Sequence, residues 1–357
     1  MYIYFFLLTL IIFFDILSRY SHLKSLPRLL GFVVIFSAIF CIWGFRDFSI
    51  GYDTVAYCKY FEAITEESVF HTLLHVEIGY KLLNKLYSIA SDEYRVLLIG
   101  NTLLLCLLLW KTLKDNALFP FTSMYLLVVS IYFFTIFDWA RQGIAMGIVY
   151  AGFGYLRNKQ YFYYAAIIIL ASLFHYSAIA LILLIAFLKL KFTILRSLIL
   201  ICITIAIHIY YNIAISFFSD FFPNFLYLSY FKVENTNRGG TMLLFLSLFM
   251  IFLFICLINN LDINRNFEQR LLAWCFLIGT CASILSLKMW WFGRLAIMFN
   301  IPVLIFLPNI LSQGIRGNLS RFLYFNAIYI IPGMYFIAWI YVVSPVAFGY
   351  VPYKFMW

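Results

Sequence analysis

The chain has 357 residues, of which 65% are hydrophobic and 11% are charged. An average globular protein has about 45–50% apolar and about 25% charged residues, and a soluble fold could not cover its surface with so few charges. The composition therefore excludes a globular enzyme, a secreted disulfide-rich protein and a disordered chain. It favours one integral transmembrane domain over residues 1–357. The net charge of +10 comes without a block of consecutive basic residues, so the sequence does not favour nucleic-acid binding.

Apolar runs of helix length follow one another at 1–17, 29–45, 95–110, 118–136, 140–156, 161–188, 194–211, 241–258, 271–287, 295–311 and 322–343. The first run contains no basic residue, so it lacks the basic n-region of a cleaved signal and is predicted to be a retained span. The run 161–188 would make a helix of about 42 Å, too long for a hydrocarbon core of about 30 Å. We therefore predict a break near His175 into two short helices that rise and return, either spanning or re-entrant. The predicted fold is an all-α polytopic membrane protein with about twelve transmembrane segments.

The charges predict the orientation of these segments. With the N-terminus outside, the loops assigned to the cytoplasm carry 14 of the 25 Lys and Arg residues but 3 of the 15 Asp and Glu residues. Such an excess of basic residues is typical of cytoplasmic loops. The long loops 46–94 and 212–240, the turns 138–141 and 288–294, and a tail from Ser344 then lie on the outer side, where any chemistry is expected.

The first outer loop contains two candidate residues. Arg46 follows the end of a span, at the depth of lipid headgroups, where a guanidinium can bind a phosphate through two hydrogen bonds. Alternatively, Arg46 anchors the span or pairs with Asp47. Asp53, close to Gly51, is either an ordinary turn aspartate or a functional carboxylate. Spacing alone favours the structural interpretation of both Arg46 and Asp53.

Further along this loop, residues 77–86 predict an amphipathic helix on the outer interface. This helix either pairs Glu77 with Lys81 across one turn or presents Glu77 to a polar substrate.

A charged turn at residues 138–142 lies between two apolar runs with no room for a solvated loop. Asp138 and Arg141 must face protein or a wet cavity, because exposure to lipid would cost several kcal/mol. They either pair with one another or, with Gln142, belong to an anion site at a helix N-terminus.

Two more candidates lie later in the chain. His175, at the predicted break, can act as a base or a hydrogen-bond donor near neutral pH, or it can bond to a neighbouring helix. Arg294, near Lys288 and two tryptophans, either anchors a span at the interface or binds phosphate. We find no HExxH, GxSxG, Walker A or GxGxxG motif, so the sequence supports neither a metal site nor a cofactor.

Four motifs occur together in this order: Arg46 ahead of Gly51-Tyr52-Asp53 and Tyr57; Glu77-Ile78-Gly79-Tyr80 followed by Leu83-Asn84; Arg141-Gln142 followed by Ile144-Ala145; and Phe174-His175-Tyr176-Ser177-Ala178. Their succession resembles the EpsG family within the Wzy-type bacterial polysaccharide polymerases. The resemblance runs from about residue 40 to 190 and weakly to Arg294. The chain departs from the family pattern at Tyr52, where threonine is usual, and at Ile78, where proline is frequent.

The resemblance implies a metal-independent glycosyltransferase of the bacterial inner membrane, with a GT-C-like architecture and an active site facing the periplasm. Such an enzyme transfers a growing O-antigen, capsule or exopolysaccharide chain from undecaprenyl diphosphate to the non-reducing end of the next lipid-linked repeat unit. Its implied partners are these lipid-linked oligosaccharides, membrane lipids and a chain-length regulator. Arg46, Arg141 and Arg294, with Gln142 and Asp138 beside them, are expected to bind substrate. Asp53, Glu77 or His175 is the expected base.

Three other functions compete with this hypothesis. A flippase for the same lipid-linked units would also need cationic residues, but transport requires access from both sides and the informative charges gather on the outer side. An O-antigen ligase would share the donor and the architecture. A membrane scaffold for glycan assembly would leave the arginines at the outer span ends without a purpose.

Overall fold

The structure is a computed structural model that describes residues 2–20, 25–66, 76–130, 132–221, 263–313, 321, 324–342 and 350–356. Contacts between residues divide the chain into two compact units, Met1–Ile179 with Ile315–Trp357 and Ala180–Gly314. The prediction of one transmembrane domain over 1–357 stays a prediction.

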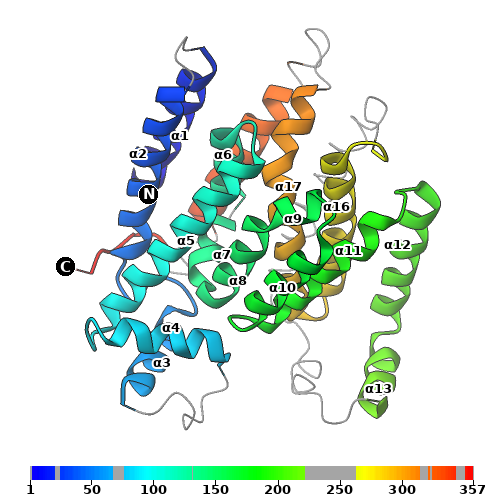
Figure 1. Ribbon diagram of the computed structural model, residues 1–357, viewed down its shortest axis with the longest axis horizontal. Helices are drawn as coiled ribbons and strands as arrows, with labels where there is room; N and C mark the ends of the chain where they lie inside the picture. The colour runs from blue at the N-terminus through cyan, green and yellow to red at the C-terminus, as the bar shows by residue number, and fades with distance from the viewer. Residues whose placement is uncertain are drawn as a thin grey trace. The chain divides into compact units, whose positions relative to one another are not determined.

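The described residues are mostly helical (Figure 1). The helices of the first unit are α1 (Tyr2–Tyr20), α2 (Ser25–Gly44), α3 (Thr54–Glu66), α4 (Ile78–Ser88), α5 (Tyr94–Asn116), α6 (Pro120–Val129), α7 (Tyr132–Asp138), α8 (Ala140–Ala151), α9 (Phe153–Arg157), α10 (Tyr161–Ser172), the π-helix η2 (Asn326–Ile330) and α19 (Ile331–Val342). Those of the second unit are α11 (Leu183–Lys189), α12 (Ile194–Ile209), α13 (Tyr211–Phe221), α16 (Phe267–Ser286) and α17 (Trp290–Gln313). The 3-10 helix η1 (Tyr176–Ile182) includes residues of both units.

Five of these helices, α1, α2, α5, α16 and α17, are long and apolar enough to cross a membrane. The number rises to seven if two bent pairs each count as one span, α6 with α7 at 79° and α12 with α13 at 85°. A polytopic, all-helical membrane protein is therefore confirmed among the described residues, whereas twelve segments and a GT-C-like architecture are not. The predicted run 241–258 and most of the predicted loop 212–240 lie outside the described residues, and residues 212–221 belong to α13.

The predicted break near His175 is confirmed, because α10 ends at Ser172 and η1 begins at Tyr176. The start of α4 binds this break directly, since the Gly79 N–H donates to the Leu173 carbonyl at 2.8 Å. Glycine permits the close approach, because a Cβ there would lie 2.7 Å from the same carbonyl oxygen. Whether the two short helices are re-entrant stays a prediction.

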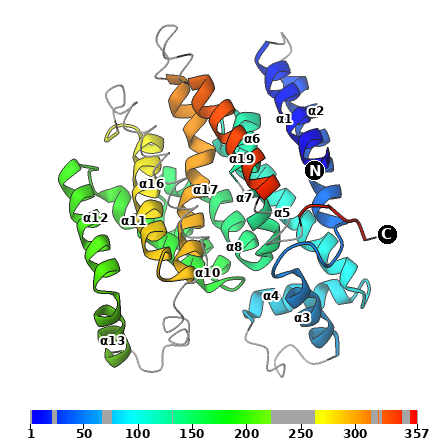
Figure 2. The same cartoon turned by 180° about the vertical axis from the view of Figure 1, so that it is seen from behind.

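The first long loop is not extended but carries two helices, α3 and α4, which lie together at one end of α2 and α5 (Figures 1 and 2). The amphipathic helix predicted at 77–86 is confirmed as α4, which begins at Ile78 after Glu77. The body of the unit is formed by α2 packing on α1 and α5, α6 on α1, and α8 on α5 and α10. Aromatic pairs such as Phe32 and Trp110, with ring centroids 5.2 Å apart, fill the space between these helices.

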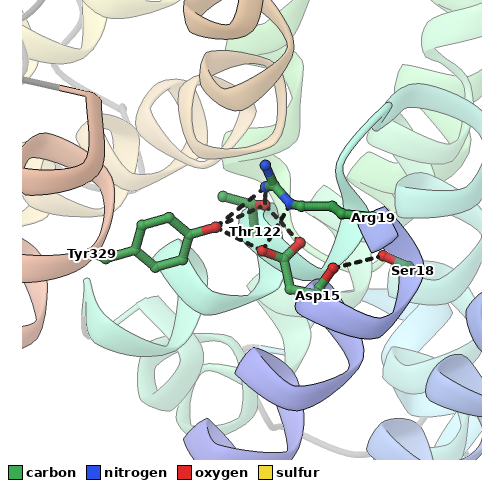
Figure 3. Close-up of polar contacts among 5 residues, drawn as sticks. All are labelled: Asp15, Ser18, Arg19, Thr122 and Tyr329. Carbon is green, nitrogen blue, oxygen red and sulfur yellow. Dashed lines mark hydrogen bonds and ion pairs between the residues drawn. The ribbon is translucent and has the colours of Figure 1, made fainter. Parts of the chain in front are cut away.

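A polar cluster around the buried Asp15 connects three helices of the first unit (Figure 3). Asp15 on α1 is 5% exposed, forms an ion pair with Arg19 at 3.2 Å, and accepts hydrogen bonds from Thr122 at 2.9 Å and Tyr329 at 2.6 Å. Arg19 also donates to the Thr122 hydroxyl at 2.6 Å. A charged pair is costly in an apolar span unless such bonds satisfy it. The cluster therefore ties α1 to α6 and to η2.

Candidate functional site

The candidate site centres on Glu77, which is 3% exposed. Its Oε2 atom lies 2.6 Å from Nη1 of Arg141, and its Oε1 atom lies 2.9 Å from Nδ1 of His175. Oε1 also accepts from the Tyr176 N–H at 3.4 Å. Three predicted residues from three separate segments thus meet at one carboxylate.

Local structure explains why these side chains meet. Glu77 occupies the N-cap position of α4 but does not cap its own helix, so its carboxylate is available for contacts outside α4. The backbone bond from Gly79 to Leu173 holds the start of α4 against the break that carries His175. Arg141 reaches the same place from the first turn of α8. The described ion pairs of Glu77 are with Arg141 and His175, not with Lys81.

The neighbours of Glu77 keep it ionised. Burial alone would raise its pKa, but the hydrogen bond with His175 and the charge of Arg141 outweigh burial and lower the pKa from 4.5 to about 2. An ionised carboxylate only accepts hydrogen bonds, so Nδ1 of His175 must be the donor in this contact. In neutral His175, the lone pair is then on Nε2.

Aromatic and amide side chains pack beside Arg141. Its guanidinium lies over the Tyr57 ring at 5.7 Å, and Tyr57 packs against Tyr80 at a centroid distance of 5.7 Å. The Tyr80 hydroxyl accepts from Asn101 Nδ2 at 3.0 Å, and burial raises the pKa of Tyr80 to about 12. Tyr80 is therefore neutral at physiological pH. Together, Tyr57 and Tyr80 form an aromatic wall beside Arg141.

Asp138 has different partners from Arg141 although the two are three residues apart. The chain changes direction at Trp139, between α7 and α8, and Asp138 is 2% exposed. Its Oδ1 atom accepts from the Asp53 N–H at 3.0 Å, and its Oδ2 atom accepts from the Tyr350 hydroxyl at 3.2 Å. Both charged residues face protein, as the sequence predicts, but the described ion pairs do not include one between Asp138 and Arg141.

Asp53 lies where Asp138 can bind its backbone because of the turn before it. Gly51 has φ of +96°, a conformation that L side chains rarely adopt, and a Cβ there would collide with Asp138 Oδ1. Asp53 directly precedes α3, and its carbonyl accepts from the Tyr57 N–H at 3.0 Å. Through α3, the turn at Gly51 is connected to the aromatic wall beside Arg141.

Arg46 is buried within the protein, and its predicted position at headgroup depth stays a prediction. It is 2% exposed, its Nη1 atom donates to the Trp43 carbonyl at 2.5 Å, and its guanidinium lies over the Phe137 ring at 4.8 Å. Burial lowers the pKa of Arg46, although nearby Asp138 acts in the opposite direction. The alternative partner, Asp47, accepts instead from Ser49. A role of Arg46 in phosphate binding stays a prediction.

The other predicted residues are placed differently. Gln142 is fully buried next to Arg141. Arg294 is the fifth residue of α17, in the second unit, and its role stays a prediction. Among the residues that the structure describes, no group of three or more His, Cys, Asp or Glu is arranged to hold a metal ion.

The model of the EpsG family matches residues 29–355 of this sequence. The chain belongs to the EpsG family. Members of this family are Wzy-like polysaccharide polymerases, and the family indicates a membrane polysaccharide polymerase of the glycosyltransferase type. No curated protein and no solved structure matches the chain.

Three tyrosines contribute to the site of this EpsG family member in ways that its sequence did not predict: Tyr57, Tyr80 and Tyr350. Tyr80 and Tyr57 belong to the quoted motifs, but their packing beside Arg141 becomes visible only in the structure. Tyr350 carried no signal, because a tyrosine in a C-terminal tail has no spacing that relates it to Asp138.

Proposed function

We propose that this protein polymerises a bacterial surface polysaccharide at the periplasmic face of the inner membrane. It transfers the growing glycan from undecaprenyl diphosphate to the non-reducing end of an incoming lipid-linked repeat unit. The observation that supports this most is the buried Glu77 carboxylate, bound by Arg141 and His175, in a chain of the EpsG family.

The reaction needs a base, and His175 is the best candidate. The acceptor hydroxyl attacks the anomeric carbon of the donor, the bond from that carbon to the diphosphate oxygen breaks, and the hydroxyl proton moves to His175 Nε2. Glu77 orients the imidazole through Nδ1 and stabilises the imidazolium that forms, as a carboxylate does beside a catalytic histidine. Glu77 itself is a poor base, because a carboxylate with a pKa of about 2 hardly accepts a proton at neutral pH.

The departing undecaprenyl diphosphate takes the electron pair and needs positive charge nearby. Arg141 supplies it from beside His175, and Arg46 and Arg294 are the further candidates for the diphosphates. Asp53, which directly precedes α3, is assigned to bind the hydroxyls of the acceptor sugar, because a carboxylate accepts hydrogen bonds from hydroxyl groups.

Deletion of the gene in the source bacterium tests this function. We expect the ladder of surface-glycan chain lengths on a gel to collapse to core plus a single repeat, and plasmid-borne wild-type protein to restore it. Loss of every repeat, with lipid-linked units accumulating, would instead favour a flippase or a ligase. Labelling those units from the periplasmic side separates these two, because units reach that side only if a flippase is still active.

A further inference from the structure

The C-terminal segment, residues 350–356, lies against the first part of the loop that follows α2 (Figure 1). Arg46 and Phe355 form an antiparallel bridge, and the Asp47 N–H donates to the Lys354 carbonyl at 3.0 Å. The sequence places this loop and the tail on the same, outer side of the membrane. The tail is thus bound to the loop that carries Arg46 and Asp53.

Within this segment, Tyr350 contacts the Asp138 carboxylate. It is 2% exposed, its ring packs against Phe134 at a centroid distance of 4.7 Å, and its carbonyl accepts from the Tyr4 hydroxyl at 3.1 Å. Burial and packing against Phe134 hold the ring, so that the hydroxyl lies 3.2 Å from Asp138 Oδ2.

The two carboxylate oxygens of Asp138 accept hydrogen bonds from different partners. Oδ2 accepts from Tyr350, whereas Oδ1 accepts from the Asp53 N–H and lies so close to Gly51 that a side chain would not fit there. The orientation of the carboxylate therefore decides where the turn of residues 51–53 lies. A carboxylate held at both oxygens cannot rotate without losing one charge-assisted hydrogen bond.

We infer that Tyr350 is a positioning residue: its hydroxyl orients the Asp138 carboxylate, which in turn holds the turn that presents Asp53 to the acceptor sugar. This inference rests on the proposed polymerase function. In this role Tyr350 acts through Asp138 and not by contact with the substrate. Its removal should loosen substrate binding while the base and the diphosphate-binding arginines keep their places.

The test compares Tyr350→Phe with wild type and with Tyr4→Phe, a matched control that removes a buried tyrosine hydroxyl bonded to the same tail but not to Asp138. The substrate is the lipid-linked oligosaccharide extracted from the deletion strain, and the purified variants are assayed in detergent micelles over a range of its concentrations. We expect Tyr350→Phe to lower kcat/KM roughly tenfold through a rise in KM with kcat nearly unchanged, the size expected for one lost hydrogen bond to a charged group. Tyr4→Phe should stay within about twofold of wild type, because the Tyr350 hydroxyl remains in place.

Each other result overturns the inference. A fall in kcat alone, with KM unchanged, would mean that Tyr350→Phe only reduces the amount of folded enzyme. Equal effects of Tyr4→Phe and Tyr350→Phe would mean that the seating of the tail matters and the bond to Asp138 does not. If wild type polymerises and Tyr350→Phe behaves like it, the inference alone is wrong. If wild type does not polymerise the extracted substrate, the proposed function and this inference fall together.

Discussion

Arg141→Ala is expected to destabilise the protein strongly, because it removes one half of a buried ion pair. The two atoms in contact are 2.6 Å apart, and the Glu77 and Arg141 side chains are only 3% and 16% exposed. Deleting one partner of such a pair typically costs about 3–5 kcal/mol, since the remaining charge stays buried without its counter-charge. His175 and the Tyr176 N–H still bind Glu77, so we expect the lower end, about 3 kcal/mol.

An exposed ion pair with nearly the same contact distance serves as a control. Lys111 and Asp115 are 2.7 Å apart, but their side chains are 59% and 43% exposed. Exposed pairs one helical turn apart contribute about 0.5 kcal/mol or less, because water and salt screen them. Lys111→Ala should therefore change the free energy of unfolding several-fold less than Arg141→Ala.

The assay is unfolding of the detergent-solubilised variants by denaturant, followed by intrinsic tryptophan fluorescence. A double variant, Glu77→Gln with Arg141→Ala, should be less destabilised than the sum of the single variants by about 1–3 kcal/mol, because the second change removes the stranded charge. Equal losses for Arg141→Ala and Lys111→Ala, or strict additivity of the double variant, would refute the reasoning that burial makes this pair strong.

Three further predictions concern pH, the second polar cluster and the turn. Because the folded-state pKa of Glu77 is lowered from 4.5 to about 2, the stability that ionised Glu77 contributes is complete above about pH 4.5 and is lost as pH falls towards 2. The difference in Tm between wild type and Glu77→Gln should therefore shrink in that window, and a constant difference would contradict the assignment. Asp15→Ala leaves Arg19 without its counter-charge and should lower the free energy of unfolding by about 3 kcal/mol in the same assay. A loss below about 0.5 kcal/mol would mean that the cluster does not stabilise the fold. Gly51→Ala should reduce polymerisation at normal protein levels, seen as a shortened glycan ladder on the gel, because it forces an unfavourable φ and a collision with Asp138; an unchanged ladder would count against the role of this turn.

Hydropathy predicted the broad architecture because lipid leaves little choice. Backbone groups in an apolar run must bond within the run, so a long apolar run in a membrane is a helix. The break at His175 was predictable for the related reason that 28 residues exceed the membrane thickness. The division of 118–136 into α6 and α7 was not predictable, because Ser130 and its neighbours carry no strong helix-breaking signal.

The site was predictable as a set of residues but not as a set of pairs. Arg141 is three residues from Asp138, and sequence spacing alone makes them partners. Instead, Arg141 binds the Glu77 carboxylate, 64 residues away in the chain, and Asp138 binds the Asp53 N–H, 85 residues away. Likewise, Lys81 is the nearest cation to Glu77 along α4, but the buried position of Glu77 favours a guanidinium that arrives from another helix. Local spacing describes only one helix, whereas a buried charge is satisfied by whatever the tertiary fold brings to it.

Asp15 illustrates the same limit from the other side. A carboxylate inside an apolar span is conspicuous in the sequence, and Arg19 one turn later is its obvious partner. Two of its hydrogen-bond donors, Thr122 and Tyr329, lie 107 and 314 residues away and are unremarkable among the many hydroxyl side chains of the chain. A charge in a span therefore announces that a polar partner must exist, because the membrane makes an unsatisfied charge too costly, but the partner can only be identified once the helices are packed. The same reasoning makes Tyr350 the most informative residue to test, since Asp138 required a donor and the sequence contained no way to choose it.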